Sequence, residues 1–223
     1  MKHFKLTTET ITTISGHKLF RIELTCTCKW GNKGTRGGFV EKEENLFGNA
    51  WVSGNAQVFG DAQVFGDAKV FGNARVSGDA WVYGNARVYG DAWVYGNAQV
   101  FGDAKVFGNA RVYGDAWVSG NARVYGDAWV SGDAKVFGNA RVYGDAWVSG
   151  DAWSNSPLQI QGSIYFVSFC TKTLLQIGCM KKTPQEWLKS KNIAEKENFT
   201  KEQIKEYSLY IKLAIEIQKL NHK

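Results

Sequence analysis

Five cationic side chains recur along the chain at intervals of eighteen residues, and an aromatic ring follows each of them two residues later. The cations are Lys69, Arg87, Lys105, Arg123 and Arg141, and the rings are Phe71, Tyr89, Phe107, Tyr125 and Tyr143. Cations bind phosphate or carboxylate groups, and rings stack on bases or fill the centres of protein interfaces. This pattern indicates binding of an acidic macromolecule, if the fold stacks residues that are eighteen apart.

Catalytic groups are scarce by comparison. The histidines are His3, His17 and His222, and residues 48–153 contain none. A general base and a three-histidine metal site are therefore both missing from that part of the sequence. The sequence also lacks a recognisable Ser-His-Asp set and a phosphate-binding glycine loop. We expect a non-catalytic protein without a cofactor or a resident metal.

Two further groups of side chains have metal-ligand chemistry. Cys26 and Cys28 are expected on one side of a strand, far from Cys170 and Cys179, so a four-thiolate zinc site is not expected. Cys170 and Cys179 either face each other across a hairpin or are buried free thiols, which we favour. Carboxylates stacked at one corner would suit Ca²⁺, although Asp is also a common turn residue. That corner series is Asp61, Asp79, Asn97, Asp115, Asp133 and Asp151.

A six-residue repeat positions all of these groups. From Gly48 to Gly150 a glycine recurs every six residues, and each unit reads Gly-(Asp/Asn)-Ala-x-Val-y. Position x is Trp, Arg, Lys or Gln, and position y is Phe, Tyr or Ser. Ala-x-Val-y predicts a half-buried strand, and Gly with Asp/Asn predicts a turn through left-handed backbone. Three units then make one triangular coil of a stacked solenoid.

The units resemble those of the hexapeptide-repeat, left-handed parallel β-helix family, in which a small residue follows an aliphatic one by four positions. Val82 with Ala86 and Val88 with Ala92 have this spacing. The resemblance implies a mainly β, single-stranded left-handed parallel β-helix. The left hand comes only from the resemblance, because the general crossover preference favours the alternative, a right-handed solenoid.

The whole chain further resembles a group of hexapeptide-repeat proteins common in bacterial and phage genomes. The N-terminal marks of this resemblance are segments 7–11, 19–22 and 37–46. Members are often labelled acyltransferase-like or polymer-forming cytoskeletal, on the basis of their repeats. The resemblance implies phage association, with blocking of a host protein as a natural use. It also supplies the enzymatic alternative, a trimeric acyltransferase.

The sequence predicts three regions: an N-terminal hairpin cap over 1–36, the solenoid over 37–153, and a C-terminal β+α cap over 154–223. Strands over 4–28 should turn near residues 15–18 and cover the first coil. Short strands are expected at 158–161, 163–169 and 174–177, followed by helices that begin at Thr183 and Thr200. The second helix is expected to cap the solenoid or, alternatively, to form a dimer contact. Its apolar residues are Ile204, Tyr207, Ile211, Ala214, Ile215 and Leu220.

Stacking of residues eighteen apart predicts three outward faces. The first begins with Trp51 and Ser53 and continues with the five cations and five rings, about 19 Å from first cation to last. A protein partner is favoured for this face, with nucleic acid and polysaccharide as alternatives. In a purely structural interpretation, the ladders only stabilise neighbouring strands. The x positions of the other faces are Gln57, Arg75, Trp93, Arg111, Trp129 and Trp147, and Gln63, Trp81, Gln99, Trp117, Lys135 and Trp153.

Composition and charge exclude several classes. The 223 residues include 25 Gly but 2 Pro, which excludes collagen, and 14% aromatic residues exclude a disordered linker. Apolar runs are too short for a membrane helix and the N-terminus lacks a signal-peptide pattern, so we expect a cytoplasmic protein without a membrane partner. The net charge of +6 comes from the ends, since residues 48–153 carry 8 basic and 10 acidic side chains. A homo-oligomer through a solenoid face or the C-terminal helix stays open.

Overall fold

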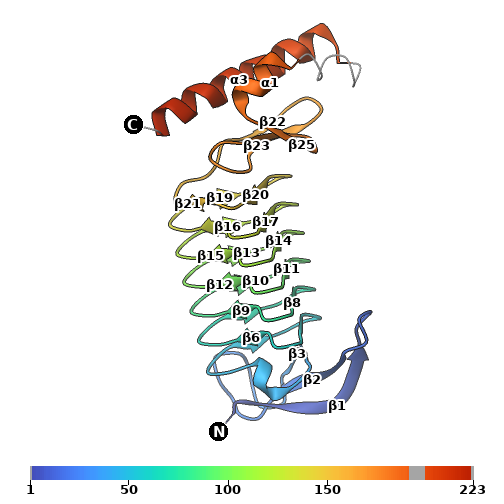
Figure 1. Ribbon diagram of the computed structural model, residues 1–223. Helices are drawn as coiled ribbons and strands as arrows, with labels where there is room; N and C mark the ends of the chain where they lie inside the picture. The colour runs from blue at the N-terminus through green and yellow to red at the C-terminus, as the bar shows by residue number, and fades with distance from the viewer. Residues whose placement is uncertain (1, 191–198, 222–223) are drawn as a thin grey trace.

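The protein is a stack of β-strand coils with a hairpin at one end and a small sheet with helices at the other (Figure 1). The computed structural model describes residues 2–190 and 199–221. The fold is mainly β, and its parallel coils form a β-solenoid of about six turns, as the six-residue repeat predicts. Each repeat unit contributes one short strand, made of residue x and the valine that follows it.

Three parallel sheets run along the stack, one for each predicted face. The sheet that we call the basic face consists of β4 (Trp51–Val52), β7 (Lys69–Val70), β10 (Arg87–Val88), β13 (Lys105–Val106), β16 (Arg123–Val124) and β19 (Arg141–Val142). The third face consists of β6 (Gln63–Val64), β9 (Trp81–Val82), β12 (Gln99–Val100), β15 (Trp117–Val118), β18 (Lys135–Val136) and β21 (Ala152–Trp153).

The remaining face alternates arginine with tryptophan, and we call it the mixed face. Its solenoid strands are β3 (Arg36–Val40), β5 (Gln57–Val58), β8 (Arg75–Val76), β11 (Trp93–Val94), β14 (Arg111–Val112), β17 (Trp129–Ser131) and β20 (Trp147–Ser149). The same sheet continues beyond β3 into the N-terminal hairpin. The hairpin therefore covers the edge of this face rather than of the other two.

The interior is a column of alanine and valine. The Ala and Val side chains of the repeat from Ala50 to Val148 are all buried, because alternation along each strand turns them inward. Backbone bonds join successive coils, as in the 2.9 Å bond that Arg87 N donates to Ala104 O. Burial of this apolar column and the regular backbone pairing together stabilise the stack.

Glycine makes the corners. Gly90 has a φ of +72°, and a Cβ on it would lie 3.1 Å from the backbone nitrogen of Gly108, so both conformation and stacking require glycine. The prediction that Asp/Asn shares the left-handed conformation is wrong. Among the described residues, Asp151 alone has a positive φ without being glycine, at 53°.

The last coil departs from the predicted pattern because its register shifts. Lys135 pairs with Ala152 and Val136 pairs with Trp153, so Trp153 occupies a core position instead of the predicted outward one. The left-handed conformation of Asp151 produces this shift by placing two such residues, Gly150 and Asp151, in succession. Trp153 is 9% exposed and closes the end of the alanine–valine column.

The N-terminal hairpin pairs β1 (Phe4–Thr12) antiparallel with β2 (Lys18–Leu24), and β2 pairs antiparallel with β3. The solenoid begins before the regular repeat, within the predicted bounds of 37–153, since Phe39 of β3 lies opposite Gln57 and Leu46 forms a bridge with Val64. A 3-10 helix, η1 (Glu43–Asn45), precedes Leu46. The hairpin ends at Leu24, so the prediction of a strand through residue 28 is wrong.

The C-terminal cap is a four-stranded antiparallel sheet followed by helices. Its elements are β22 (Gln159–Gln161), β23 (Phe166–Phe169), β24 (Leu175–Ile177), β25 (Met180–Lys182), α1 (Pro184–Lys189) and α3 (Lys201–Asn221). The first three strands and the two helices were predicted, whereas β25 was not. The capping box of Thr183 and Glu186 at the start of α1 is confirmed.

The sheet, rather than the long helix, makes the main contact with the last coil. Ser149 N donates a 2.8 Å bond to Cys170 O, and α3 lies beyond the sheet in Figure 1. The apolar stripe of α3 is narrower than predicted. Tyr207, Ile211 and Ala214 are buried, whereas Ile204 and Leu220 are exposed. None of the described helices is long and apolar enough to cross a membrane.

Candidate functional site

The predicted cations lie in one column on the basic face. Arg87 pairs in register with Lys69 on one side and with Lys105 on the other, and Arg123 lies between Lys105 and Arg141 in the same way. Adjacent strands of a sheet are about 4.8 Å apart, so each of the three inner cations has like charges directly above and below it. We call Lys69, Arg87, Lys105, Arg123 and Arg141 the basic column.

Most of the basic column has no internal partner. Within the described parts of the chain, no ion pair, side-chain hydrogen bond or cation–π contact involves the charged groups of Arg87, Lys105, Arg123 or Arg141. Only Lys69 has one, because its ammonium lies 4.4 Å from the centroid of the Trp30 ring. Like charges directly opposite each other on a sheet destabilise it, so the column is a local cost to the fold.

A groove of about 480 Å³ runs along this column. Its far wall is the neighbouring corner, which supplies Asp67, Asn85, Asp103 and Asn121. Lys29 and Trp30 close the N-terminal end: Trp30 Nε1 donates a 2.7 Å bond to Asn49 O, and the Lys29 ammonium pairs with Asp67. That ion pair and its hydrogen bond hold the pKa of Asp67 below its usual range.

The five predicted rings form a separate column beside the cations. We call Phe71, Tyr89, Phe107, Tyr125 and Tyr143 the ring column. Successive rings are stacked, with centroids 4.7 Å apart for Phe71 and Tyr89 and 4.9 Å apart for Tyr89 and Phe107. No described cation of the basic column lies over one of these rings. The rings therefore stack on each other and not on the cations of the same coils.

The mixed face uses its cations differently. The guanidinium carbons of Arg75 and Arg111 lie 4.9 and 5.3 Å from the Trp93 ring centroid. Arg111 also lies 4.9 Å from the centroid of Trp129. Each arginine is thus stacked on a tryptophan of a neighbouring coil, an attractive cation–π arrangement.

Asn–Asp hydrogen bonds join successive coils at some corners, and the predicted calcium corner has one of them, between Asn97 and Asp115. Asn97 Nδ2 donates a 2.8 Å bond to Asp115 Oδ1, and Asn109 Nδ2 donates a 2.9 Å bond to Asp127 Oδ1. Asn and Asp on successive coils therefore satisfy each other across the corner. No group of three His, Cys, Asp or Glu side chains with metal-binding geometry occurs in the part of the chain that the structure describes.

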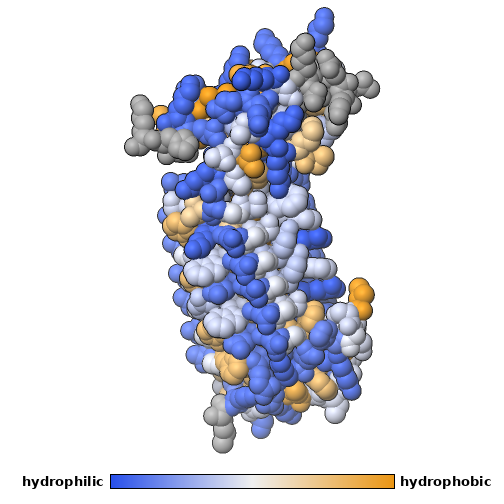
Figure 2. Space-filling model, viewed as in Figure 1, coloured by the Kyte–Doolittle hydropathy of each residue, from blue (hydrophilic) through white to orange (hydrophobic). Residues whose placement is uncertain are grey.

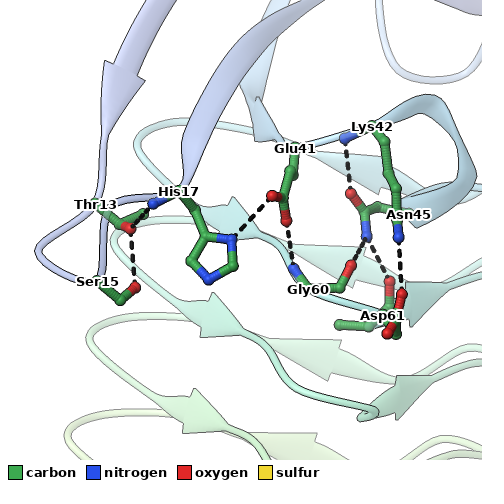
Figure 3. Close-up of polar contacts among 9 residues, drawn as sticks. Thr13, Ser15, His17, Glu41, Lys42, Asn45, Gly60 and Asp61 are labelled. Carbon is green, nitrogen blue, oxygen red and sulfur yellow. Dashed lines mark hydrogen bonds and ion pairs between the residues drawn. The ribbon is translucent and has the colours of Figure 1, made fainter.

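Both histidines that the structure describes attach the N-terminal module to the solenoid. His3 Nε2 lies 3.1 Å from Ala50 O. His17 Nδ1 lies 2.9 Å from Glu41 Oε1, as Figure 3 shows. Burial lowers the pKa of His3 below its usual value. His222 lies outside the described residues. These contacts hold the histidines in structural positions at the first coil.

The four cysteines are free thiols in different surroundings. Cys170 is buried, which raises the pKa of its thiol, whereas Cys26 and Cys179 are exposed. The prediction of two buried thiols in the C-terminal cap therefore holds for Cys170 and is wrong for Cys179. Cys26 and Cys28 lie in the turn region after β2, not on a strand.

Sequence reasoning did not identify Lys29 and Trp30 as part of the groove. Both lie outside the repeat, in the connection between β2 and β3, and a contact of long sequence separation brings them to Asn49, Asp67 and Lys69. The signal that was available is the adjacent cation and indole, a local copy of the cation–ring pattern in the repeat.

The fold and its six-residue unit define the class: the chain is a β-solenoid repeat protein. A family model described as the YdcK beta solenoid repeat matches residues 68–84, 80–96, 104–120, 116–132 and 134–150. These segments are similar to that repeat and all lie within the coils. No curated protein matches the chain. The match supports a repeat β-helix protein and leaves the acyltransferase-like and cytoskeletal resemblance unconfirmed.

Proposed function

We propose that this protein is a non-catalytic interaction scaffold that docks an acidic protein partner on its basic face. The observation that carries the proposal is the register of Arg87, Lys105, Arg123 and Arg141, which form no ion pair with the described residues. An acidic partner offsets the repulsion between these like charges when it binds. The rigid coils keep the spacing fixed before binding, which lowers the ordering cost of association.

The arrangement favours a protein over nucleic acid or polysaccharide. Single-stranded nucleic acids bind by stacking bases on ring faces, but the faces in the ring column are occupied by neighbouring rings 4.7 to 5.5 Å away. Asp67 and Asp103 in the groove also reduce the positive field that would attract a polyanion. Tryptophan faces suited to sugars are covered by arginine on the mixed face.

The enzymatic alternative, an acyltransferase, finds no support in the position of the two described histidines, which are bonded to the backbone of Ala50 and to Glu41. Phage association and the blocking of a host protein remain part of our proposal on the strength of the sequence resemblance. Acyl-CoA turnover by the purified protein would contradict the proposal.

A pair of matched double variants tests the basic face. Arg87→Glu with Arg123→Glu should abolish capture of the native partner from host extract, whereas Arg75→Glu with Arg111→Glu on the mixed face should keep it. Mass spectrometry identifies the captured protein, and circular dichroism checks that both variants keep their strands. If both variants still capture the partner as the unmodified protein does, the partner binds a different face. Capture of nucleic acid that nuclease treatment removes would overturn the protein assignment.

A further inference from the structure

On the mixed face, the column of stacked rings lacks an aromatic side chain in one coil. The y positions of successive coils on this face are Phe59, Ser77, Tyr95 and Tyr113. Tyr95 and Tyr113 are stacked at 5.0 Å, as in the ring column, but Ser77 interrupts the series. Phe59 and Tyr95 therefore sit two strand spacings apart, about 9.6 Å, with a serine between them.

The gap opens into a groove of about 410 Å³. This volume lies within the range of small-molecule sites, about 300–1,000 Å³. Phe59, Ser77 and Tyr95 line it together with Arg75 and Trp93. One planar ring inserted above Ser77 would have a ring neighbour on each side at about the 5 Å spacing of the existing ladders.

The tip of the β1–β2 hairpin forms the opposite wall of the groove, through residues 12–15. The hairpin projects from the side of the coils in Figure 1, and hydrophobic surface is visible at its tip in Figure 2. Hydrogen bonds fix the turn: His17 N donates a 3.0 Å bond to Thr13 Oγ1, whose hydroxyl lies 3.0 Å from Ser15 Oγ (Figure 3). The wall is therefore built before a ligand arrives.

A bond network ties this wall to the first coil. Glu41 Oε1 lies 2.9 Å from His17 Nδ1, and Glu41 Oε2 accepts a 2.7 Å bond from Gly60 N. Gly60 follows Phe59, whose ring lies 5.1 Å from the His17 ring. The same contacts thus hold both the hairpin and the ring at one side of the gap.

The polar groups of the groove indicate what the ring carries. The Arg75 guanidinium has no carboxylate partner among the described residues and lies over Trp93. The Gln57 amide and the Ser77 hydroxyl make no side-chain hydrogen bond to described residues, so they are available to the edge of a heteroaromatic ring. A cation beside a ring-sized gap suits a planar base joined to an anionic group.

We propose that this slot, formed by Phe59, Arg75, Ser77, Trp93 and Tyr95, binds a nucleotide. The base stacks between Phe59 and Tyr95, and the phosphate contacts Arg75. The slot is independent of the docking surface proposed above, because it lies on a different sheet.

Titration calorimetry of the full chain with three probes tests the assignment. AMP should bind saturably, while adenosine and ribose 5-phosphate, which each lack half of the recognised chemistry, should bind at least tenfold more weakly. Absence of saturable AMP binding at millimolar concentration would overturn the proposal. Tighter binding of indole-3-acetate than of AMP would overturn the nucleotide assignment.

Two serine variants provide a matched comparison. Ser77→Tyr restores the missing rung and should lower AMP affinity at least tenfold. Ser119→Tyr fills a similar break, between Phe101 and Phe137 on the third face, where the hairpin is not part of the sheet. AMP affinity should be unchanged in this control. Unchanged affinity in Ser77→Tyr, with the fold verified by circular dichroism, would place AMP elsewhere.

Arg75→Gln tests the phosphate contact separately. The variant should reduce AMP affinity to the level of adenosine and leave adenosine binding as in the unmodified protein. A parallel loss for both probes would mean that Arg75 supports the slot only through Trp93, and the proposed phosphate contact would be wrong.

Discussion

The basic face and the mixed face are built from the same repeat unit, yet their cations have opposite surroundings. On the mixed face, Arg111 lies between the rings of Trp93 and Trp129. On the basic face, Arg123 lies between Lys105 and Arg141. The backbone, the core and the strand spacing are the same at both positions, so the neighbours in the column account for the difference.

This difference separates cations that stack on rings of the solenoid from cations that have no partner among the described residues. An arginine between two tryptophans contributes about 0.5–1 kcal/mol per cation–π contact at an exposed site. An arginine between two other cations contributes repulsion instead. A repeat protein can thus change the surroundings of its surface cations without any change of fold, by the choice of residue at position x alone.

The ring column of the basic face is continuous, whereas the series of stacked rings on the mixed face is interrupted at Ser77. The largest predicted effect tests this difference. Tyr89→Ser on the basic face removes two stacked contacts, with Phe71 at 4.7 Å and Phe107 at 4.9 Å. We expect a loss of about 1–3 kcal/mol, since each aromatic pair contributes about 0.5–1.5 kcal/mol. Thermal unfolding should show the melting temperature lower by several degrees.

The matched change on the mixed face is Ser77→Tyr, which completes a ladder and should raise the melting temperature. A fall in melting temperature for both variants would indicate that stacking between coils does not stabilise the solenoid. The continuous and the interrupted ladders of rings would then not differ in their contribution to the stability of the solenoid.

The second prediction breaks the cation comparison directly. Arg111→Ala removes contacts with Trp93 and Trp129 and should cost about 1–2 kcal/mol. Arg123→Ala removes repulsion from Lys105 and Arg141 and should be neutral or stabilising by less than about 1 kcal/mol. Denaturant unfolding of the two variants measures both signs. Equal destabilisation would show that the arginine stems, rather than their charges, determine the effect.

The repeat was sufficient to predict the solenoid and the placement of the basic column. Glycine every six residues and the Ala-x-Val alternation determine the corners, the inward side chains and the pairing of residues eighteen apart, as in Arg87 with Lys105. These are local rules repeated many times, so an error in one unit has little effect on the whole. The left hand of the coil stays a prediction from resemblance.

The repeat did not predict what happens where it stops. Trp153 continues the six-residue repeat in sequence. The positive φ of Asp151 nevertheless turns the Trp153 side chain into the core. Trp30 reaches the basic face from outside the repeat through its bond to Asn49 O. Long-range packing decides both positions. Position x alone also could not show that Arg111 lies over two rings while Arg123 has no partner among the described residues.

The third prediction concerns salt. Salt concentration should change the contribution of Arg123 on the basic face to the melting temperature more than that of Arg111 on the mixed face. Raising the salt from 0.1 to 1 M shortens the screening length from about 10 Å to about 3 Å and weakens repulsion in the basic column. The melting temperature of the unmodified protein should rise, and Arg123→Gln should reduce that rise, whereas Arg111→Gln should not. Charges in the two caps are common to all three proteins and cancel in the comparison. Identical salt responses would contradict unscreened repulsion at Arg123.

The N-terminal module is attached to the mixed face through Glu41 and to the basic face through Trp30. The smallest predicted effect concerns these two attachments. Burial raises the pKa of Glu41, but the hydrogen bonds from His17 and Gly60 outweigh it, so the pKa lies below its usual range. The contribution of Glu41 is therefore complete above the usual pKa of a glutamate and is lost as the pH falls through the lower value in the folded protein. The expected loss is below about 1 kcal/mol, as for other partly exposed pairs.

Acidification should therefore loosen the hairpin on the mixed face before it releases Trp30 on the basic face. The bond from Trp30 Nε1 to Asn49 O and the contact with Lys69 involve no group that titrates in acid. The neighbouring ion pair with Lys29 holds the pKa of Asp67 below its usual range. Hydrogen exchange between pH 6 and pH 3, corrected for intrinsic rates, should show amide protection falling in β1 and β2. Glu41→Gln should remove the part of this pH dependence that lies near His17, whereas the ion pairs of Glu9 and Glu23 keep their own contribution. If the variant loses amide protection in acid as the unmodified protein does, Glu41 does not anchor the hairpin. The attachments on the mixed face and the basic face would then not differ in their dependence on Glu41.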